Sequence, residues 1–599
     1  MTLRAIAGLA LLNGALLGVG GAMLWGLGAV RWWTDLVRLG GVAHLLGVAA
    51  TMIALTLQLV VGIQVTGASG ALTLVVLACA GAGIGVARGR QRPGLVPGWQ
   101  LPRVSPFVAV LVAGFVVYFE ALFRAARLSS ILPEWDGWWF WVPKAKAIYF
   151  FGELDPDLLS QIANPSYPPG LPVVHALAFG AMGSADETTL HVQYWFYAVG
   201  FAAAVAGLLA PRVRQAIWVP LLVLIFLAPS FLTRMTWTYA DVPLGYLVTV
   251  AALLVILWID DARPWQLHAA MALLGGAMLT KREGVLFALA VLLAALVATR
   301  ARRRELWPRL IVTLVAAFGL ALSWRVWLVA NGLPGDGPAG GYLGLFDHLG
   351  RAWPSLELVV ETLIDRDLWL VVPLLSFVAI AFAAVARERT LWVFAASFTA
   401  AFVCVATWTI WADPTLPFTQ DDARNPIVRL TGTAILVLGT LTPLLLEHVW
   451  TRSGDLRGSV GGLAARASHL MFRPRPAAWA IVVVAAVGYP GSMLVGSSRM
   501  TLPGGFSSFP GGTDCVSEHV RGEPARIVFA YAAAYPEAQD VQRRVRAAGL
   551  RDAEVVQDGC GRLRVFADVE AEAVAELIET ARTARLEASL EARSGKGTR

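Results

Sequence analysis

The sequence predicts an all-α polytopic membrane protein with a small α+β domain at its C-terminal end. Of its 599 residues, 57% are hydrophobic and only 15% are charged, whereas about a quarter of a soluble protein is charged. The mean hydropathy is +0.63, and the apolar residues gather in blocks of about twenty, the length that crosses a bilayer. From about residue 500, short strand and helix patterns replace these long apolar blocks.

About fourteen apolar segments are long enough to cross a membrane. They occupy 5–30, 41–65, 69–88, 106–127, 188–210, 214–232, 239–259, 266–280, 284–300, 309–331, 367–387, 390–411, 427–449 and 477–497. The segments within 1–90 precede the polar motifs described below and are expected to be additional N-terminal helices. The region 91–498 is expected to be the main transmembrane module.

Arginine-rich connections between the apolar segments predict on which side of the membrane each loop lies. These connections are 88–105, 211–214, 300–309 and 451–476. If the chain crosses the membrane at every segment, they all fall on one side, which the positive-inside rule makes the cytoplasm. The long loops and both ends of the chain then lie outside the cell membrane; the loops are 128–187, 332–366 and 412–426. The same rule explains the net charge of +7 without a nucleic-acid partner, and Arg4 leads into a retained span rather than a cleaved signal peptide.

Residues 499–599 are expected to form a linker and a small extracytoplasmic domain. A Gly/Pro/Ser-rich stretch precedes alternating strand and helix patterns. The expected elements are strands at 525–532 and 562–569 and helices at 536–550 and 568–592. This pattern resembles the SPOR-type peptidoglycan-binding fold, but a small domain that covers the outer mouth of the protein is the favoured interpretation.

The chain has four cysteines, and none has the spacing to histidine that a zinc site needs. Cys79 and Cys404 lie inside apolar runs and are expected to be small core residues. Cys515 and Cys560 both lie in the C-terminal region and could form a disulfide in an oxidising compartment.

The polar stretch 134–172 lies between two apolar segments and carries the first candidate site. Glu134 and Asp136 are followed by Lys144 and Lys146 in a run rich in tryptophan and phenylalanine. Aromatic side chains of this kind lie at the headgroup level of a bilayer. Lysines there meet lipid phosphates, and a carboxylate close to them can act as a base. The stretch therefore predicts an active site at a membrane surface.

Charged residues recur where later apolar segments begin or end, and each has a plain structural alternative. Asp241 in TYADVPLGY could simply cap a helix. Lys281, Arg282 and Glu283 in LTKREGVLF could form a hydrophilic turn, although a turn on the outer side is not normally the basic one. Arg429 lies one turn inside a span, which indicates a polar cavity unless the side chain extends to the interface.

Tyr167 and His175 belong to the segment YPPGLPVVHAL. The two prolines after Tyr167 make the chain there rigid and extended or turning. His175 lies on the helical run that follows, and a lone histidine of this kind is more often a structural group than a ligand. Each motif alone is weak, and their order along the chain is the specific signal.

This order resembles that of the GT-C superfamily of glycosyltransferases, which are multi-span enzymes that use polyprenyl-phosphate-linked sugars. The chain is most similar to the protein O-mannosyltransferase and aminoarabinose-transferase type. The family's acid in the first outer loop is matched by Asp136 in EWDGW, its interfacial helix by WVPKAKAIYFFG and its Tyr-Pro-Pro segment by SYPPGLP. The acid that opens a later span is matched by YADVPL, and the Lys-x-Glu-Gly turn by TKREGV. The resemblance covers 106–300 well and 300–450 by general architecture. Many relatives have adjacent acids in the first loop, whereas Trp135 separates Glu134 from Asp136 here.

The resemblance implies transfer of a hexosyl or pentosyl group from a polyprenyl-phosphate donor to a hydroxyl of a glycan, lipid or protein acceptor. The sugar carbon would be inverted, with Asp136 as the base and Glu134 and Asp241 as further catalytic candidates. The leaving phosphate would meet cations, and the expected binding residues are Lys144, Lys146, Tyr167, His175, Lys281, Arg282, Glu283 and Arg429. No cofactor is expected. Asp136 and Asp241 could approach a divalent metal, but two carboxylates make a poor site and no metal is predicted.

Two functions from other classes remain open. A flippase or transporter of lipid-linked sugars would also place charges within spans, but related halves with broken helices are not evident in the sequence. A non-catalytic envelope protein that binds glycan through its tail would leave Asp136 and the lysines unexplained. A ligase or polymerase of lipid-linked glycans is a close variant of the enzyme prediction.

Overall fold

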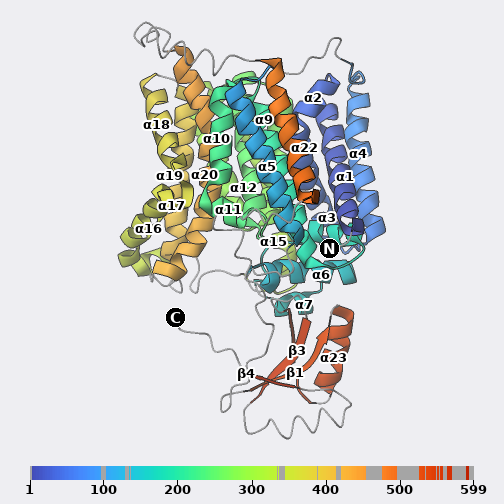
Figure 1. Ribbon diagram of the computed structural model, residues 1–599. Helices are drawn as coiled ribbons and strands as arrows, with labels where there is room; N and C mark the ends of the chain where they lie inside the picture. Colours follow the sequence, from blue (N-terminus) through green and yellow to red (C-terminus); the bar gives the residue numbers. More distant parts are fainter. Residues whose placement is uncertain are drawn as a thin grey trace.

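The computed structural model describes most of the chain, and most of the described residues are helical (Figure 1). The described residues are 3–95, 103–128, 134, 136–162, 164–333, 335, 344–386, 389–412, 420–452, 475–495, 525–532, 535–547, 549–551, 553–557, 563–569 and 589–592. The long helices run side by side in one bundle, and a small sheet lies beyond one end of it (Figure 1).

Within these ranges, nine helices are long and apolar enough to cross a membrane. They coincide or overlap with α1 (Leu3–Leu27), α3 (Gly40–Val60), α4 (Gly67–Ala87), α5 (Pro106–Leu128), α9 (Leu190–Leu209), α12 (Asp241–Asp261), α15 (Arg303–Ala330), α19 (Arg389–Ala412) and α20 (Gln420–Arg452). A tenth is reached if the helices that end at Trp369 and begin at Val372 are one span bent by 115°.

Shorter helices complete the bundle. Those in the remaining predicted apolar segments are α10 (Gln215–Leu227), α13 (Pro264–Thr280), α14 (Gly284–Ala298), α18 (Val372–Val385) and α22 (Trp479–Val495). The connections and the ends of those segments contain α2 (Trp33–Arg38), α6 (Val142–Phe151), α7 (Pro156–Gln161), α11 (Pro229–Arg234), α16 (Ala352–Ile364) and α17 (Arg366–Trp369). A further apolar helix, α8 (Gly170–Met182), lies within 128–187, the predicted outer loop, and it packs into the bundle against α1, α3 and α6. The segment 214–232 is not one continuous helix. It breaks at Ala228 because Pro229 begins a new helix, α11, and has no backbone N–H to continue the old one.

The helices at the centre of the bundle have apolar side chains on all their faces. In α12 every residue from Asp241 to Ile259 is buried, and most of the apolar part of α3 and of α20 is buried as well. Outer helices expose large apolar side chains, as α15 does with Val312, 66% exposed, and Val315, 65% exposed. Such side chains need a hydrocarbon surrounding, so the protein lies in a lipid bilayer.

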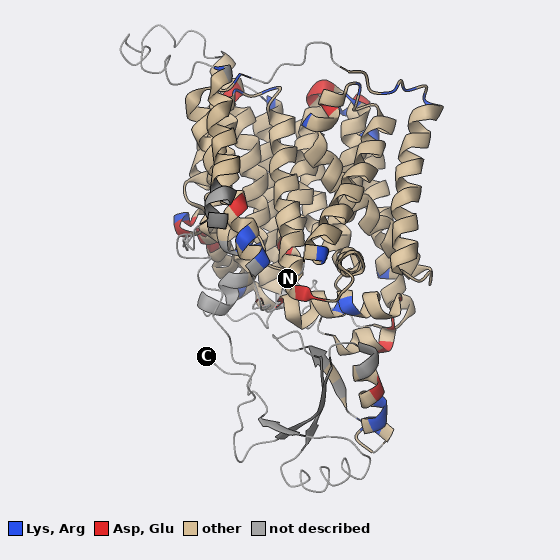
Figure 2. Cartoon of the chain, turned by 45° about the vertical axis from the view of Figure 1, so that its right-hand side comes forward, with Lys and Arg blue, Asp and Glu red and all other residues tan. Residues whose placement is uncertain are grey.

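Charged residues gather near the two ends of the bundle, and few lie in its middle (Figure 2). Three of the four predicted basic connections meet at one end, where Arg212, Arg300 and Thr451 line the same cavity. Asp241 begins α12 at the other end. These three connections are therefore separated from Asp241 by the length of the bundle.

The N-terminal helices are part of the core of the bundle. Helix α3 contacts α1, α8, α9, α13 and α15. A Cβ on Gly20 would lie 1.7 Å from the carbonyl oxygen of Ala43, and one on Gly41 would lie 2.1 Å from the backbone nitrogen of Ala204. These glycines let the helix backbones touch, as small residues do in membrane bundles.

The C-terminal region has a four-stranded antiparallel sheet in the order β2-β3-β1-β4. Its elements are β1 (Ala525–Ala532), α23 (Tyr535–Ala547), β2 (Glu554–Gln557), β3 (Leu563–Val569) and β4 (Ser589–Ala592). The helix predicted at 568–592 is wrong at both ends: β3 runs to Val569, and β4 pairs with the free edge of β1, Leu590 opposite Ile527. Strand pairing across the sheet outweighs the helical propensity of this segment. The middle of the predicted helix lies outside the described residues.

Two cysteines differ from expectation. Cys79 in α4 and Cys404 in α19 are exposed rather than buried in the core. A lipid-facing surface is as apolar as the core, so the surrounding sequence does not distinguish the two positions. Cys515 and Cys560 lie outside the described residues.

Candidate active site

Asp136 lies at the N-terminal end of a π-helical turn, η1 (Gly137–Trp141), that continues into α6. A Cβ on Gly137 would lie 2.2 Å from the Thr238 hydroxyl oxygen, so a glycine is needed for this turn to approach the chain before α12. The rings of Phe140 and Trp141 stack on Tyr167 at centroid distances of 5.4 and 5.3 Å. The aromatic run thus fixes the Asp136 turn against the Tyr-Pro-Pro segment.

Arg429 of α20 joins the two candidate aspartates. Its Nη2 bonds to Asp136 Oδ2, while its Nε and Nη2 lie 2.8 and 2.7 Å from Asp241 Oδ2. The three side chains are only 8–12% exposed. The sequence signal of an arginine inside a span therefore corresponds to a buried bridge between carboxylates from η1 and α12.

The α13–α14 turn adds a second cation to Asp241. Lys281 Nζ lies 2.8 Å from Asp241 Oδ1 and 3.5 Å from Glu283 Oε1. Burial alone would lower the pKa of Lys281, but the carboxylates of Asp241 and Glu283 raise it above its ordinary value. Arg282 Nε lies 3.8 Å from Glu283 Oε1, and its side chain is 28% exposed. We call these six residues the ion cluster: Asp136, Asp241, Lys281, Arg282, Glu283 and Arg429.

Two tyrosines line the ion cluster. The Arg282 guanidinium lies 5.0 Å and Lys281 Nζ 5.8 Å from the Tyr167 ring centroid, and Arg429 lies 4.6 Å from that of Tyr239. Tyr167 also donates a weak hydrogen bond to Glu283, at 3.5 Å. Burial raises the pKa of both Tyr167 and Tyr239 to about 12, so both phenols are neutral hydrogen-bond donors at pH 7.

Arg234 at the end of α11 was not singled out from the sequence. Burial lowers the pKa of its guanidinium, while the nearby carboxylates of Asp241 and Asp136 act in the opposite direction. It is therefore a further cation beside the ion cluster. In the sequence, Arg234 lies between two apolar segments on the predicted outer side. Arg282 has the same feature.

Glu134 lies in a different environment from Asp136. Its Oε1 accepts hydrogen bonds from the backbone N–H and the hydroxyl of Thr238, at 2.8 and 3.0 Å, and lies 2.9 Å from His191 Nε2. Burial would raise the pKa of Glu134, but His191 and the Thr238 donors hold it below its ordinary value. Its side chain is fully buried, so Glu134 fastens the Asp136 turn to α9 and to the Thr238 segment.

The two lysines of α6 are occupied by protein groups. Lys144 Nζ donates to the backbone carbonyls of Asn164 and Tyr167, at 2.6 and 3.2 Å. Lys146 Nζ lies 2.6 Å from Glu187, and both side chains are buried. Lys144 thus holds the loop before the Tyr-Pro-Pro segment, and Lys146 holds the start of the α9 span.

His175 is also separate from the ion cluster. It is fully buried in α8, and its ring lies 5.5 Å from that of Tyr194. Neither ring nitrogen has a hydrogen-bond partner among the described residues. Its position is that of a core residue between α8 and α9.

The ion cluster can hold an anion and accept a proton. Together with Arg234 it has four cations and three carboxylates, so its formal charge is positive. Asp136 Oδ1 accepts no hydrogen bond from the described residues, whereas Oδ2 is bonded to Arg429. Among those residues there is no group of three histidine, cysteine or carboxylate side chains that could hold a metal ion.

Comparisons of the chain with protein families, curated protein sequences and solved structures gave no significant match. The geometry of the ion cluster is therefore the basis for a functional proposal.

Proposed function

We propose that this protein is a membrane glycosyltransferase that moves a sugar from a polyprenyl-phosphate-linked donor to an acceptor hydroxyl. The observation that supports it is the Arg429 bridge: it joins the candidate base Asp136 to Asp241 and, through Asp241, to Lys281. Transfer from a sugar phosphate needs a proton acceptor at one side of the anomeric carbon and positive charge at the other. The ion cluster offers both within one connected set of side chains.

In the proposed reaction, Asp136 Oδ1 accepts the proton of the acceptor hydroxyl while the hydroxyl oxygen bonds to the anomeric carbon. The bond from that carbon to the phosphate oxygen breaks in the same displacement, so the sugar carbon is inverted. Arg429 orients the Asp136 carboxylate, because it donates a hydrogen bond to the other oxygen, Oδ2.

The departing lipid phosphate gains charge, and Arg282 is the most accessible cation of the ion cluster to meet it. Lys281 and Arg429 add to the positive potential from buried positions. Tyr167 and Tyr239 would donate hydrogen bonds to phosphate or sugar oxygens. We leave Lys144, Lys146, His175 and Glu134 out of the reacting set because each has a structural place elsewhere.

The proposal includes a topology. The chain would cross the cell membrane about fourteen times, with the basic connections in the cytoplasm and the ion cluster outside. The C-terminal sheet and α23 would form an extracytoplasmic α+β domain, and they contact α6 and α7 beside the ion cluster. Gln542 of α23 donates to Gln161 of α7 at 2.9 Å. The donor's polyprenyl chain would lie against the spans, and the acceptor would be a glycan, lipid or protein.

The test is sugar transfer by purified protein in lipid vesicles with a panel of polyprenyl-phosphate sugars. Asp136→Asn keeps the shape and removes the base, so turnover should fall by roughly a hundredfold or more. Asp157→Asn is the matched control, because Asp157 is an exposed acid of α7 outside the ion cluster. It should leave turnover unchanged.

The other functions give different results. If no donor is turned over but labelled lipid-linked sugar crosses the bilayer, the protein is a transporter. If the protein neither transfers nor moves sugar but binds glycan through its tail, it is an envelope binding protein. Full transfer by Asp136→Asn would show that Asp136 is not the base.

A further inference from the structure

A second charged region lies at the other end of the bundle from the ion cluster. Asp241 and Asp260 lie near opposite ends of α12, about 28 Å apart at the usual rise per residue. Beside Asp260, a cavity of about 890 Å³ opens between α12, α14, α19 and α20. Sites for small ligands usually measure about 300–1,000 Å³.

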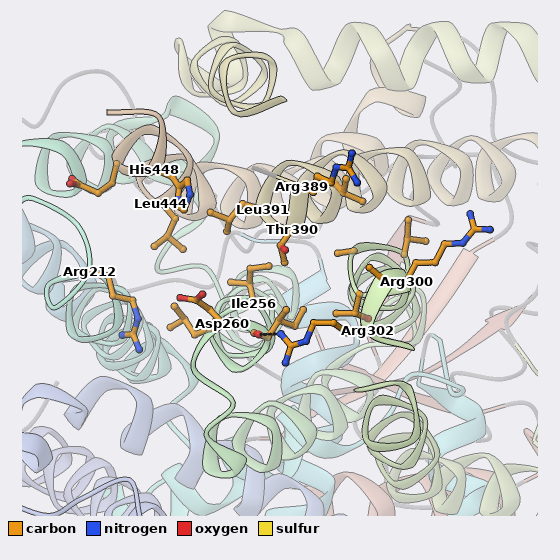
Figure 3. A pocket seen from close by; sticks show the side chains of 18 of the residues that line it. Arg212, Ile256, Asp260, Arg300, Arg302, Arg389, Thr390, Leu391, Leu444 and His448 are labelled. Carbon is orange, nitrogen blue, oxygen red and sulfur yellow. Dashed lines mark hydrogen bonds between the residues drawn. The ribbon is translucent and has the colours of Figure 1, made fainter. Parts of the chain in front are cut away.

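The lining of this cavity has an apolar part and a charged part. Leu257, Val297, Val393 and Leu444 supply apolar surface from four different helices. The arginines that line it are Arg212, Arg300, Arg302, Arg303 and Arg389. Figure 3 shows Arg212 on one side of Asp260 and Arg300, Arg302 and Arg389 on the other. A lining of this kind fits an amphiphile better than a fully polar ligand.

Only some of these arginines are neutralised by protein groups. Arg212 is paired with Asp261, and Arg302 lies 3.2 Å from Glu305. Within the described part of the chain, Arg300, Arg303 and Arg389 form no ion pair. The positive-inside rule explains why arginines lie at this end, but it does not require them to surround a cavity with apolar walls.

The carboxylates of Asp260 and Glu447 also line the cavity, and they restrict the ligands that it can bind. Glu447 is paired with Arg214 at 3.3 Å. Asp260 forms no ion pair with any described residue, and it lies between the two groups of arginines (Figure 3). A ligand with only negative charge would be repelled by Asp260. A head group with a phosphate and a hydrogen-bond donor would satisfy both the arginines and the carboxylate.

We propose that this cavity binds a glycerophospholipid whose phosphodiester lies among Arg300, Arg303 and Arg389 and whose head group donates a hydrogen bond to Asp260. Phosphatidylglycerol, through a hydroxyl, and phosphatidylethanolamine, through its ammonium, both have this chemistry. Phosphatidylcholine has the phosphate but no donor. The acyl chains lie against the apolar walls, and basic pockets between transmembrane helices are a known form of lipid site.

The test is native mass spectrometry of the full chain in detergent, titrated with short-chain forms of the three lipids. The native protein should bind the glycerol and ethanolamine lipids about tenfold more tightly than the choline lipid, since only they bond to Asp260. Asp260→Asn should remove most of this preference.

The arginines are tested with Arg303→Ala combined with Arg389→Ala. Loss of each phosphate-facing arginine should weaken binding about fivefold, hence roughly 25-fold for the pair. The control is Arg304→Ala, because Arg304 is exposed beside Arg303 but does not line the cavity.

Three results would overturn the proposal. The first is equal binding by the double variant and the Arg304→Ala control. The second is no difference among the three lipids in the native protein, which needs no variant to fold. The third is binding of water-soluble glycerophosphoglycerol as tightly as the lipid, which would make the cavity a site for soluble phosphodiesters.

Discussion

The Arg429 bridge allows a quantitative test of how the ion cluster is held together. Replacing Arg429 with methionine keeps much of the side-chain volume and removes the charge. Asp241 would keep only Lys281, and Asp136 would lose its ion pair. Because all three side chains of the bridge are at least 88% buried, the loss should cost about 3–5 kcal/mol in the free energy of unfolding, the range for breaking a buried pair.

The destabilisation caused by Arg429→Met should be smaller when Asp241 is already replaced. With Asp241→Asn already present, Arg429 has one buried carboxylate fewer to neutralise. The double variant should therefore be more stable than the sum of the single variants predicts, by about 1.5–3 kcal/mol, the contribution of a charged hydrogen bond. Denaturant unfolding in detergent, followed by tryptophan fluorescence, measures all four proteins.

Arg325→Met is the matched control, because Arg325 is exposed on α15. It should change the free energy of unfolding by no more than about 0.5 kcal/mol. The reasoning is refuted if the two single changes add to within about 0.5 kcal/mol in the double variant. Arg429 and Asp241 would then be neighbours without energetic coupling.

Two further predictions concern the surroundings of the ion cluster. Glu134→Gln should destabilise the protein at pH 7 by about 1–3 kcal/mol, because the native carboxylate is ionised and hydrogen-bonded. The folded pKa of Glu134 lies below the ordinary value of 4.5, so its stabilisation is present above that pH and is lost as the pH falls through the folded pKa. The gap between variant and native unfolding free energies should therefore close in acid, and a gap that widens in acid would contradict the assignment. Gly20→Ala should destabilise the bundle strongly, since its Cβ would lie 1.7 Å from the Ala43 carbonyl oxygen, whereas Gly18→Ala, with open space around it, should not; equal melting temperatures of the two variants would refute the close packing of α1 on α3.

The sequence predicts the ion cluster better than the rest of the site. Asp241 and Arg429 are visible because a charge at or within an apolar span is costly and needs a partner. That each is the other's partner is not visible, because they lie far apart in the chain and meet only through the packing of α12 on α20.

Lys144 and Lys146 show the opposite case. They are as prominent in the sequence as Arg429, but the Asn164 carbonyl and the Glu187 carboxylate occupy them. No local pattern shows that a cation is already satisfied. The choice between Glu134 and Asp136 has the same difficulty, since it depends on distant partners: His191 and Thr238 contact Glu134, whereas Arg429 contacts Asp136.

For the fold as well, some features can be predicted from the sequence and others cannot. Helices are found in all the predicted apolar segments, because apolar length is a strong signal. The exposed positions of Cys79 and Cys404 and the strand at Ser589–Ala592 were not foreseen. Each of these features depends on whether the residue faces lipid, the protein core or the edge of β1.

The burial of α3 has a consequence for the order in which the protein is made. This helix enters the membrane before α9 and α13, the helices that later cover it. It has no Asp, Glu, Lys or Arg side chain, so it can stay in lipid with its backbone hydrogen bonds satisfied. The first helices then act as a template on which the later ones assemble. A shortened chain that began at residue 91 would leave the faces of α9 and α13 that α3 covers without a partner.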